Sequence, residues 1–206
     1  EEARQKKSRI YDISEDNLKF KEKAGKYIDF LNANAYDKER DVRTNIAGEF
    51  QKSNLAAALQ TAELICGRLD EDKIYEALSQ IRISGRMEEI APGIIVDVSH
   101  NIQGMQGFVQ TVEANYHGMK KRILFAASHQ NEEEYMKNIL KTIPEIEAFY
   151  TVGIHKRRID EAEFQDAFRK MIDRNQETTV CFVVGSFYLA GLAKEFINQE
   201  EENVRL

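Results

Sequence analysis

A short apolar run followed by a helical pattern occupies residues 93–118, which read GIIVDVSHNIQGMQGFVQTVEANYHG. The run Ile94–Val98 is rich in β-branched residues and bounded by turn or polar residues, which is typical of a buried strand. The apolar residues after it recur at helical spacing: Met105, Phe108, Val109, Val112 and Tyr116. We expect this helix to end near Gly118.

The same alternation of apolar runs and amphipathic helices continues along the chain. Three further runs predict buried strands: Arg122–Ala127, Ala148–Val152 and Val180–Val184. Three more helices are expected: one over Tyr135–Ile143, one starting at Asp160 with Glu163 in capping-box position, and one running from Ser186. Strands and helices at this spacing predict an α/β fold with a mostly parallel sheet flanked by helices. Ligands of such sheets bind beyond the carboxyl ends of the strands.

The first part of the chain has a different character. Residues 1–52 are highly charged and weakly periodic, which predicts irregular or short elements. From Ser53, the predicted cap, apolar residues recur at helical spacing to residue 69. A second helix follows, with Asp70 as its predicted cap. The change of pattern near residue 88 predicts a domain boundary there.

Charge and cysteine content narrow the class of protein. The formal net charge is −6, whereas nucleic-acid binding needs a concentrated positive face, so we expect neither a nucleic acid nor an anionic membrane as partner. No apolar run approaches the about 20 residues of a membrane span. Cys66 and Cys181 lie in apolar stretches without a CxxC pattern, which predicts buried free thiols in the cytoplasm, with no disulfide and no zinc site.

Polar residues follow the first and last predicted strands. Asp97, His100 and Asn101 come after the first, where a carboxylate, an imidazole and an amide could meet a ligand near a helix N-terminus. The alternative is that Asp97 and Asn101 only cap the helix and His100 is a surface residue. Ser186 follows the last strand, and a plain strand-to-helix turn capped by its hydroxyl is the alternative there.

Two basic features could contact anions. Arg86 follows a glycine between the helical region and the first strand, and an arginine can hold a phosphate or carboxylate bidentately, although most such arginines are simply solvated. The run 155–158 is basic and could steer an anionic substrate or form a solvated loop. The sequence contains no GxxxxGK[ST] loop, no GxGxxG opening a helix and no GxSxG elbow, so a triphosphate cradle would have to come from elsewhere.

Four segments, in order, resemble motifs of the folylpolyglutamate and dihydrofolate synthases, a family of the Mur ligase superfamily. GEFQKSNLAAAL (48–59) is similar to G-x-H-Q-x-x-N-A-A-L-A, SGRME (84–88) to P-G-R-[FLM]-E, DVSHN (97–101) to D-[GV]-A-H-N, and GSFYL (185–189) to G-S-[FL]-Y-L. The resemblance covers roughly residues 45–197. It implies that residues 1–88 are the C-terminal part of a central ATP-binding domain and residues 89–206 a C-terminal Rossmann-like domain.

The resemblance also implies a reaction and roles for five residues. Such enzymes use ATP and Mg²⁺ to phosphorylate a carboxylate of folate or of its glutamate tail, and the amine of L-glutamate then attacks the acyl phosphate. Dihydrofolate synthesis is a further activity that the resemblance leaves open. Asn54, Arg86 and Asp97 match nucleotide-contacting positions, while His100 and Ser186 match positions beside the incoming glutamate. No residue is implied as a metal ligand, because the phosphate-binding half that serves Mg²⁺ has no counterpart here. We expect a monomer.

This chain departs from the family pattern at Phe50, where histidine is usual, and at Ser84, where proline is usual. Without the phosphate-binding half it should be inactive alone, and we expect it to be part of a longer protein. The alternatives are another Mur-type ligase that joins amino acids to a cell-wall precursor, or a domain that has lost catalysis and binds a nucleotide or a partner protein.

Overall fold

The computed structural model divides the chain into two compact units. One unit comprises residues 1–46 and 50–81, and the other residues 47–49 and 82–206. The structure describes residues 6, 19–20, 29–32, 40–44, 46–48, 51–67, 70–128, 130–155, 158–173 and 178–205.

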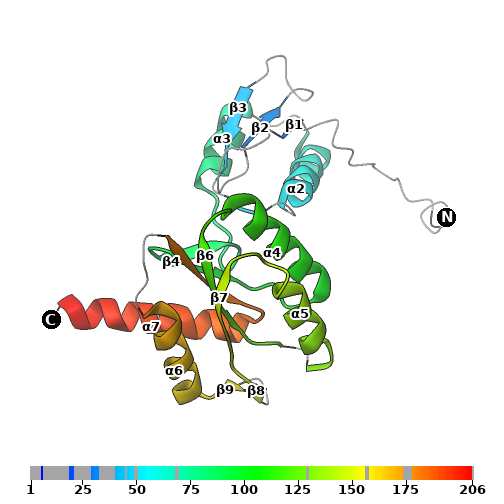
Figure 1. Ribbon diagram of the computed structural model, residues 1–206. Coiled ribbons are helices and arrows are strands. Elements are labelled where there is room, and N and C mark those ends of the chain that lie inside the picture. The colour runs from blue at the N-terminus through cyan, green and yellow to red at the C-terminus, as the bar shows by residue number, and fades with distance from the viewer. Residues whose placement is uncertain are drawn as a thin grey trace. The chain divides into compact units, whose positions relative to one another are not determined.

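The larger unit is built on a five-stranded sheet (Figure 1). Its strands are β4 (Glu88–Ala91), β5 (Ile94–Asp97), β6 (Lys120–Phe125), β7 (Ile146–Thr151) and β10 (Thr179–Val184), in the order β4-β5-β10-β6-β7. β10 runs parallel to both β5 and β6, β7 runs parallel to β6, and β4 is antiparallel to β5. The predicted α/β fold with a mostly parallel sheet is confirmed.

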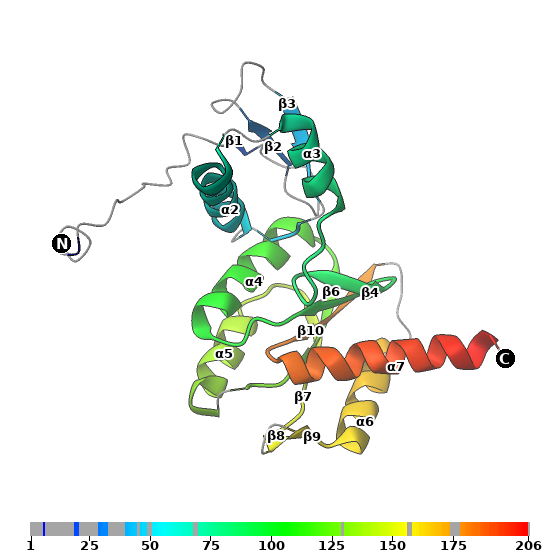
Figure 2. The same cartoon turned by 180° about the vertical axis from the view of Figure 1, so that it is seen from behind.

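Helices cover both faces of this sheet (Figure 2). α4 (Ile102–Asn115) and α5 (Glu133–Leu140) lie on one face, and α6 (Glu161–Ile172) and α7 (Phe187–Arg205) on the other. On the first face Phe108 meets Phe182 of β10 edge-to-face, with ring centroids 5.5 Å apart. On the second face Phe168 and Phe196 join the core that contains Val183. Full burial of each such side chain contributes about 1.5–3 kcal/mol to the stability of this unit.

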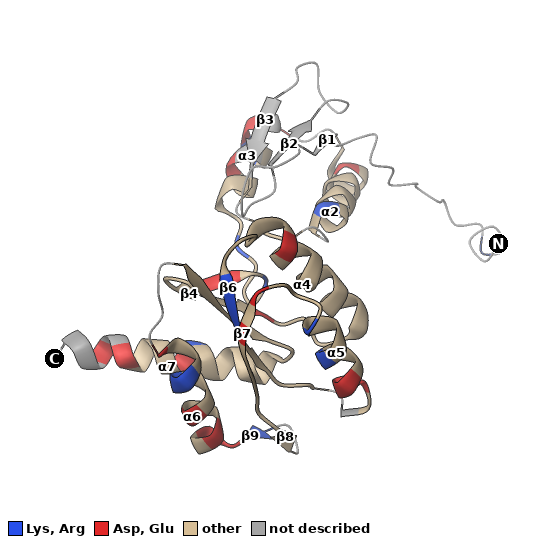
Figure 3. Cartoon of the chain, in the orientation of Figure 1, with Lys and Arg blue, Asp and Glu red and all other residues tan. Residues whose placement is uncertain are grey.

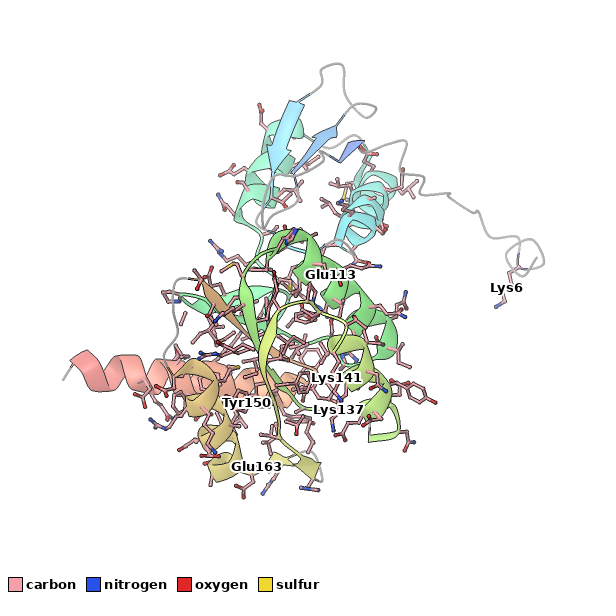
Figure 4. All side chains as sticks on the ribbon, in the orientation of Figure 1. Lys6, Glu113, Lys137, Lys141, Tyr150 and Glu163 are labelled. Atoms are coloured by element: carbon pink, nitrogen blue, oxygen red, sulfur yellow. The ribbon has the colours of Figure 1, made fainter. Side chains whose placement is uncertain are left out.

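Side-chain caps fix where two of these helices begin. Asn101 accepts a hydrogen bond from the Gly104 amide at 2.7 Å, and Asp160 accepts one from the Glu163 amide at 2.9 Å. The carboxylate of Glu163 faces the Gly153 amide at 3.4 Å, so it ties α6 to the loop after β7 (Figure 4). The predicted cap at Asp160 is therefore confirmed.

Three short strands of the larger unit were not predicted from the sequence: β4, β8 (Ile154–His155) and β9 (Arg158–Ile159). β4 pairs with β5 across a turn at Pro92-Gly93. Three of its four residues are partly buried and Glu89 is exposed, so it lacks the apolar run that marks the other strands. β8 and β9 form a small antiparallel pair within the predicted basic loop. Residues 156 and 157 of that loop lie outside the described residues.

The smaller unit contains a three-stranded antiparallel sheet and two helices. The strands are β1 (Lys19–Phe20), β2 (Asp29–Asn32) and β3 (Arg40–Arg43), and the helices are α2 (Gln51–Cys66) and α3 (Glu71–Gln80). A small core of Ile46, Leu55 and Leu78 holds it together. The strands are among the short elements expected within residues 1–52.

One of the two predicted caps in this unit is wrong. α2 begins at Gln51, so Ser53 lies inside the helix rather than before it. The helix starts earlier because Gln51 is buried and its side chain accepts a hydrogen bond from the Asn54 amide group at 2.8 Å. Asp70 does cap α3, accepting from the Lys73 amide at 3.3 Å.

The two cysteines differ in exposure. Cys181 is buried in β10, as predicted, and burial raises the pKa of its thiol to about 11. The prediction for Cys66 is wrong: it ends α2 beside Leu64 and Ile65, and all three residues are exposed. Within the described ranges, no helix combines the length and the apolar character that a membrane crossing needs.

Candidate functional site

Two loop segments lie side by side at the carboxyl edge of the sheet. β5 and β10 are neighbouring parallel strands, and their last residues, Asp97 and Val184, are Cα partners. The segments that follow both strands therefore leave the sheet at the same edge. The rings of His100 and Phe187, one from each segment, have centroids 5.5 Å apart.

Asp97 is the buried centre of this edge. Its Oδ2 accepts a hydrogen bond from the Met87 amide at 3.0 Å, and its Oδ1 accepts one from the Ser99 amide at 2.8 Å. Arg86 Nη1 lies 3.9 Å from Oδ1. Burial raises the pKa of the Asp97 carboxyl, and hydrogen bonding from Ser99 and Met87 and the charge of Arg86 oppose that rise only in part. Asp97 does not cap α4, so this part of the alternative is wrong.

A tight turn carries Arg86 to Asp97. Gly85 has a φ of +71°, and a Cβ there would lie 2.7 Å from Val98 Cγ1. The Gly85 carbonyl accepts a hydrogen bond from the Val98 amide at 2.7 Å. The Arg86 side chain keeps 28% of its surface exposed, whereas that of Asp97 keeps none. Of this pair, the guanidinium is the group that an anionic ligand can reach.

His100 has a defined orientation. Its Nδ1 lies 3.0 Å from the Val98 carbonyl oxygen. Because a carbonyl only accepts, Nδ1 carries a proton, which makes Nε2 the acceptor nitrogen of the neutral ring. The ring is half-buried and rests against Phe187, so the sequence alternative of a plain surface residue does not fit.

Asn101 and Ser186 both cap helices, which is the alternative role predicted from the sequence for each of them. Asn101 caps α4, and Ser186 Oγ accepts a hydrogen bond from the Tyr188 amide at 3.1 Å in the first turn of α7. Ser186 is almost fully buried. Gly185 before it has a φ of +108°, and a Cβ there would lie 2.5 Å from the Ala126 carbonyl oxygen, so the turn from β10 into α7 accepts no side chain.

The electrostatics of this edge favour an anion. The N-termini of α4 and α7 both face it, and neither helix has an acidic residue in its first turn. Glu113, near the far end of α4, is the one charged residue of that helix (Figure 3). The positive ends of the two helix dipoles therefore act together with Arg86. A phosphate or carboxylate is the ligand that fits these donors.

The remaining predicted site residue lies elsewhere. Asn54 is on α2 in the smaller unit, where its side chain donates to Gln51. In the described part of the chain no three His, Cys, Asp or Glu side chains gather in a way that could hold a metal ion.

Two residues of this edge have no counterpart among the predicted sites. Lys194 of α7 contacts both Glu88 and Ser84, at 2.5 Å and 2.6 Å. Glu88 was visible in the sequence only as part of a motif, and Lys194 carried no signal, because a lysine within an amphipathic helix is usually solvated.

Comparison with solved structures identifies the fold. A folylpolyglutamate synthase from Thermotoga maritima aligns with 95% of this chain at a TM-score of 0.69 and 23% identity. The chain has the fold of these synthases. FolC of E. coli, solved in complex with ADP, aligns with 90% of the chain at a TM-score of 0.71 and 15% identity. A pseudomurein peptide ligase type C from Methanothermus fervidus aligns with 89% at 0.63 and 19%.

The folylpolyglutamate synthase fold is matched over only part of its length. The chain spans 50% of the T. maritima protein, 47% of FolC and 42% of the peptide ligase. No family profile and no curated protein sequence matches the chain.

Proposed function

We propose that this chain is the C-terminal half of an ATP-dependent ligase that adds glutamate to folate. The observation that carries the proposal is the convergence of Arg86, Asp97, His100 and Ser186 on one edge of the sheet, in a fold shared with folylpolyglutamate synthases. One of the similar structures is a complex of such a synthase with AMPPCP and folate, which supports ATP and folate as the substrates. The smaller unit would be the end of the central ATP-binding domain, and the larger unit, which includes residues 82–206, the C-terminal Rossmann-like domain.

The reaction proposed for the whole enzyme has two steps. A carboxylate oxygen of folate attacks the γ-phosphorus of ATP, which releases ADP and leaves an acyl phosphate. The amine of L-glutamate then attacks the acyl carbon, phosphate leaves, an amide forms and the amine loses a proton. The triphosphate and Mg²⁺ would be held by the other half of the enzyme, because neither a phosphate-binding loop nor a metal cluster occurs among the described residues.

This chain would supply charge and orientation. Arg86, partly exposed and attached to the buried Asp97, would contact a nucleotide phosphate, and Asp97 would act through Arg86. Asn54 would make a further nucleotide contact. His100, with Nε2 as an acceptor, and Ser186, at the start of α7, would lie beside the incoming glutamate, whose carboxylates the two helix N-termini favour.

The proposal also covers the cellular compartment and the oligomeric state. We infer a cytoplasmic location, because the exposed Cys66 is a free thiol and a reducing compartment keeps such thiols reduced. We also propose that the protein is a monomer.

The experiment is a glutamate-ligation assay that follows ADP release, made on the polypeptide that joins this chain to a phosphate-binding half. Arg86→Ala and His100→Ala should each lower kcat/KM at least about 100-fold, as loss of one positioned charge or hydrogen bond does in other enzymes. Arg169→Ala is the control, because Arg169 is an equally charged but exposed residue of α6. Equal rates in all three variants would refute the proposed site.

A second candidate function is ligation of an amino acid to a cell-wall precursor, which the likeness to the pseudomurein peptide ligase favours. The same assay separates the two, because only the acyl substrate changes. ADP release with a peptide-bearing precursor and none with any reduced folate would favour the second candidate. A polypeptide that binds no ATP would instead indicate a domain that has lost catalysis.

A further inference from the structure

Four groups converge beside the turn that carries Arg86. Oε2 of Glu88 accepts hydrogen bonds from the Gly85 amide at 2.6 Å, from the Ser84 hydroxyl at 3.3 Å and from Lys194 Nζ at 2.5 Å. Lys194 Nζ also donates to Ser84 Oγ at 2.6 Å. We call this set, made of Ser84, Gly85, Glu88 and Lys194, the linker clamp.

The clamp joins parts of the chain that are distant in sequence. Glu88 starts the edge strand β4, whereas Lys194 lies on α7, 110 residues after Ser84. Both charged side chains are mostly covered, with 29% of Lys194 and 34% of Glu88 exposed, so water screens the pair less than a fully exposed one. Partial burial alone would raise the pKa of Glu88, but bonds from Lys194 and Gly85 outweigh it and lower the pKa below its ordinary value.

The backbone that follows Arg86 is also held by contacts. Met87, the next residue, is buried and has a φ of +46°, a conformation that a residue with a side chain adopts only when its surroundings hold it. Its amide donates to Asp97 Oδ2. Arg86 therefore stands between Gly85, bound to Glu88 and Val98, and Met87, bound to Asp97. The backbone on each side of Arg86 has a fixed partner within the larger unit.

We propose that Glu88 and Lys194 are positioning residues, which hold the turn 84–87 so that Arg86 is presented beside Asp97. The turn then belongs to the larger unit. The chain enters this unit at residue 82, directly after one of its crossings between the units, and residues 81–83 are exposed. The part of the inference that concerns the nucleotide rests on the proposed function, whereas the clamp itself does not.

The clamp also explains a departure from the family pattern. Where the pattern has proline, whose ring fixes the backbone, this chain has Ser84. Its hydroxyl accepts from Lys194 and donates to Glu88, which no proline can do. We infer that side-chain bonds here replace the rigidity that the proline ring would give.

Amide hydrogen exchange on this chain tests the clamp without any need for activity. Glu88→Ala removes the acceptor of the Gly85 amide, and Lys194→Met removes the group that holds Glu88. Exchange at Gly85 should quicken at least about tenfold in both variants and return toward the wild-type rate in Lys194→Arg. The Cys181 amide, which donates to the Gly93 carbonyl in the sheet, should keep its rate and so report that the fold is intact.

Lys170→Met is the matched control, because Lys170 forms an ion pair on α6 away from the turn. It should leave Gly85 exchange unchanged. Unchanged exchange in Lys194→Met, or equal acceleration in Lys170→Met, would overturn the clamp.

A kinetic test addresses the nucleotide. In the joined polypeptide Lys194→Met should raise KM for ATP about tenfold while changing kcat little, because the lost interaction orients Arg86 for binding. Faster exchange at Gly85 with KM for ATP unchanged would overturn the positioning role and leave the ligase proposal standing. Absence of ligation in the wild type would refute the proposed function alone, since the exchange test stands without it.

Discussion

Replacing Asp97 by alanine should destabilise the larger unit by about 2–4 kcal/mol. The change leaves two buried amides, those of Met87 and Ser99, without their acceptor, and each unsatisfied buried donor costs about 1–3 kcal/mol. Removing the buried carboxyl also removes its own desolvation cost, so the expected loss of stability is smaller than the largest sum of the two amide costs. Met87 also loses the bond that holds its left-handed backbone.

Urea unfolding of this chain measures the effect. Asp160→Ala is the control, because it makes the same chemical change at a residue that accepts one exposed amide hydrogen bond at the start of α6. Loss of such a cap costs about 1 kcal/mol. If Asp97→Ala were no more destabilising than Asp160→Ala, the reasoning that Asp97 organises the turn would be refuted.

The difference in unfolding free energy between the wild type and Asp97→Ala should depend on pH, which gives an independent check. Burial raises the pKa of Asp97 above its ordinary value of 3.8, so the folded state binds this proton more tightly than the unfolded state. The stability that Asp97 contributes therefore decreases as the pH rises from 3.8 through the raised pKa. The alanine variant has no carboxyl group at this position, so its stability does not show this decrease. The gap between wild type and Asp97→Ala should widen toward pH 4. A gap that narrows there would mean that the hydrogen bonds outweigh burial.

Two further predictions concern packing and thiol chemistry. Gly185→Ala should cost about 2–4 kcal/mol in thermal unfolding, because its Cβ would lie 2.5 Å from the Ala126 carbonyl oxygen at a φ of +108°. Gly191→Ala, in open space on α7, should be neutral or stabilising by about 1 kcal/mol, and equal losses in both would contradict the reasoning. In the folded chain at pH 8, Cys66 should react with a disulfide reagent, and Cys181, buried with a pKa of about 11, should react only after unfolding. Two equally fast thiols would contradict it.

The sequence was sufficient for the parts of the fold that depend on burial. Val180–Val184 is a continuous apolar run, and Ile94–Val98 is apolar except for Asp97, because helices cover both faces of the sheet; such runs are visible without coordinates. β4 was missed for the opposite reason. It is a half-exposed edge strand of four residues, and its place is set by pairing with β5 rather than by its own side chains.

The sequence indicated which residues follow the parallel strands, but not which of these strands are neighbours or which bonds their residues form. Asp97 and Ser186 lie at the same edge because β5 and β10 pair with each other in parallel. That Asp97 binds the Met87 amide depends on a turn folding back from ten residues earlier, and that Lys194 reaches Ser84 depends on the path of α7. Contacts between segments that are distant in sequence do not produce a periodic pattern of residues, so they cannot be predicted from such a pattern.

The order of strands in the sheet has a consequence for biosynthesis. β10 comes last in the chain, yet it lies between β5 and β6, which do not pair with each other. During translation the earlier strands would leave the ribosome without their central partner, and the sheet could close only after residues 179–184 had emerged. Until then two apolar strand edges stay open to other chains, so this unit should depend on chaperones more than a sheet whose strands pair in the order of synthesis.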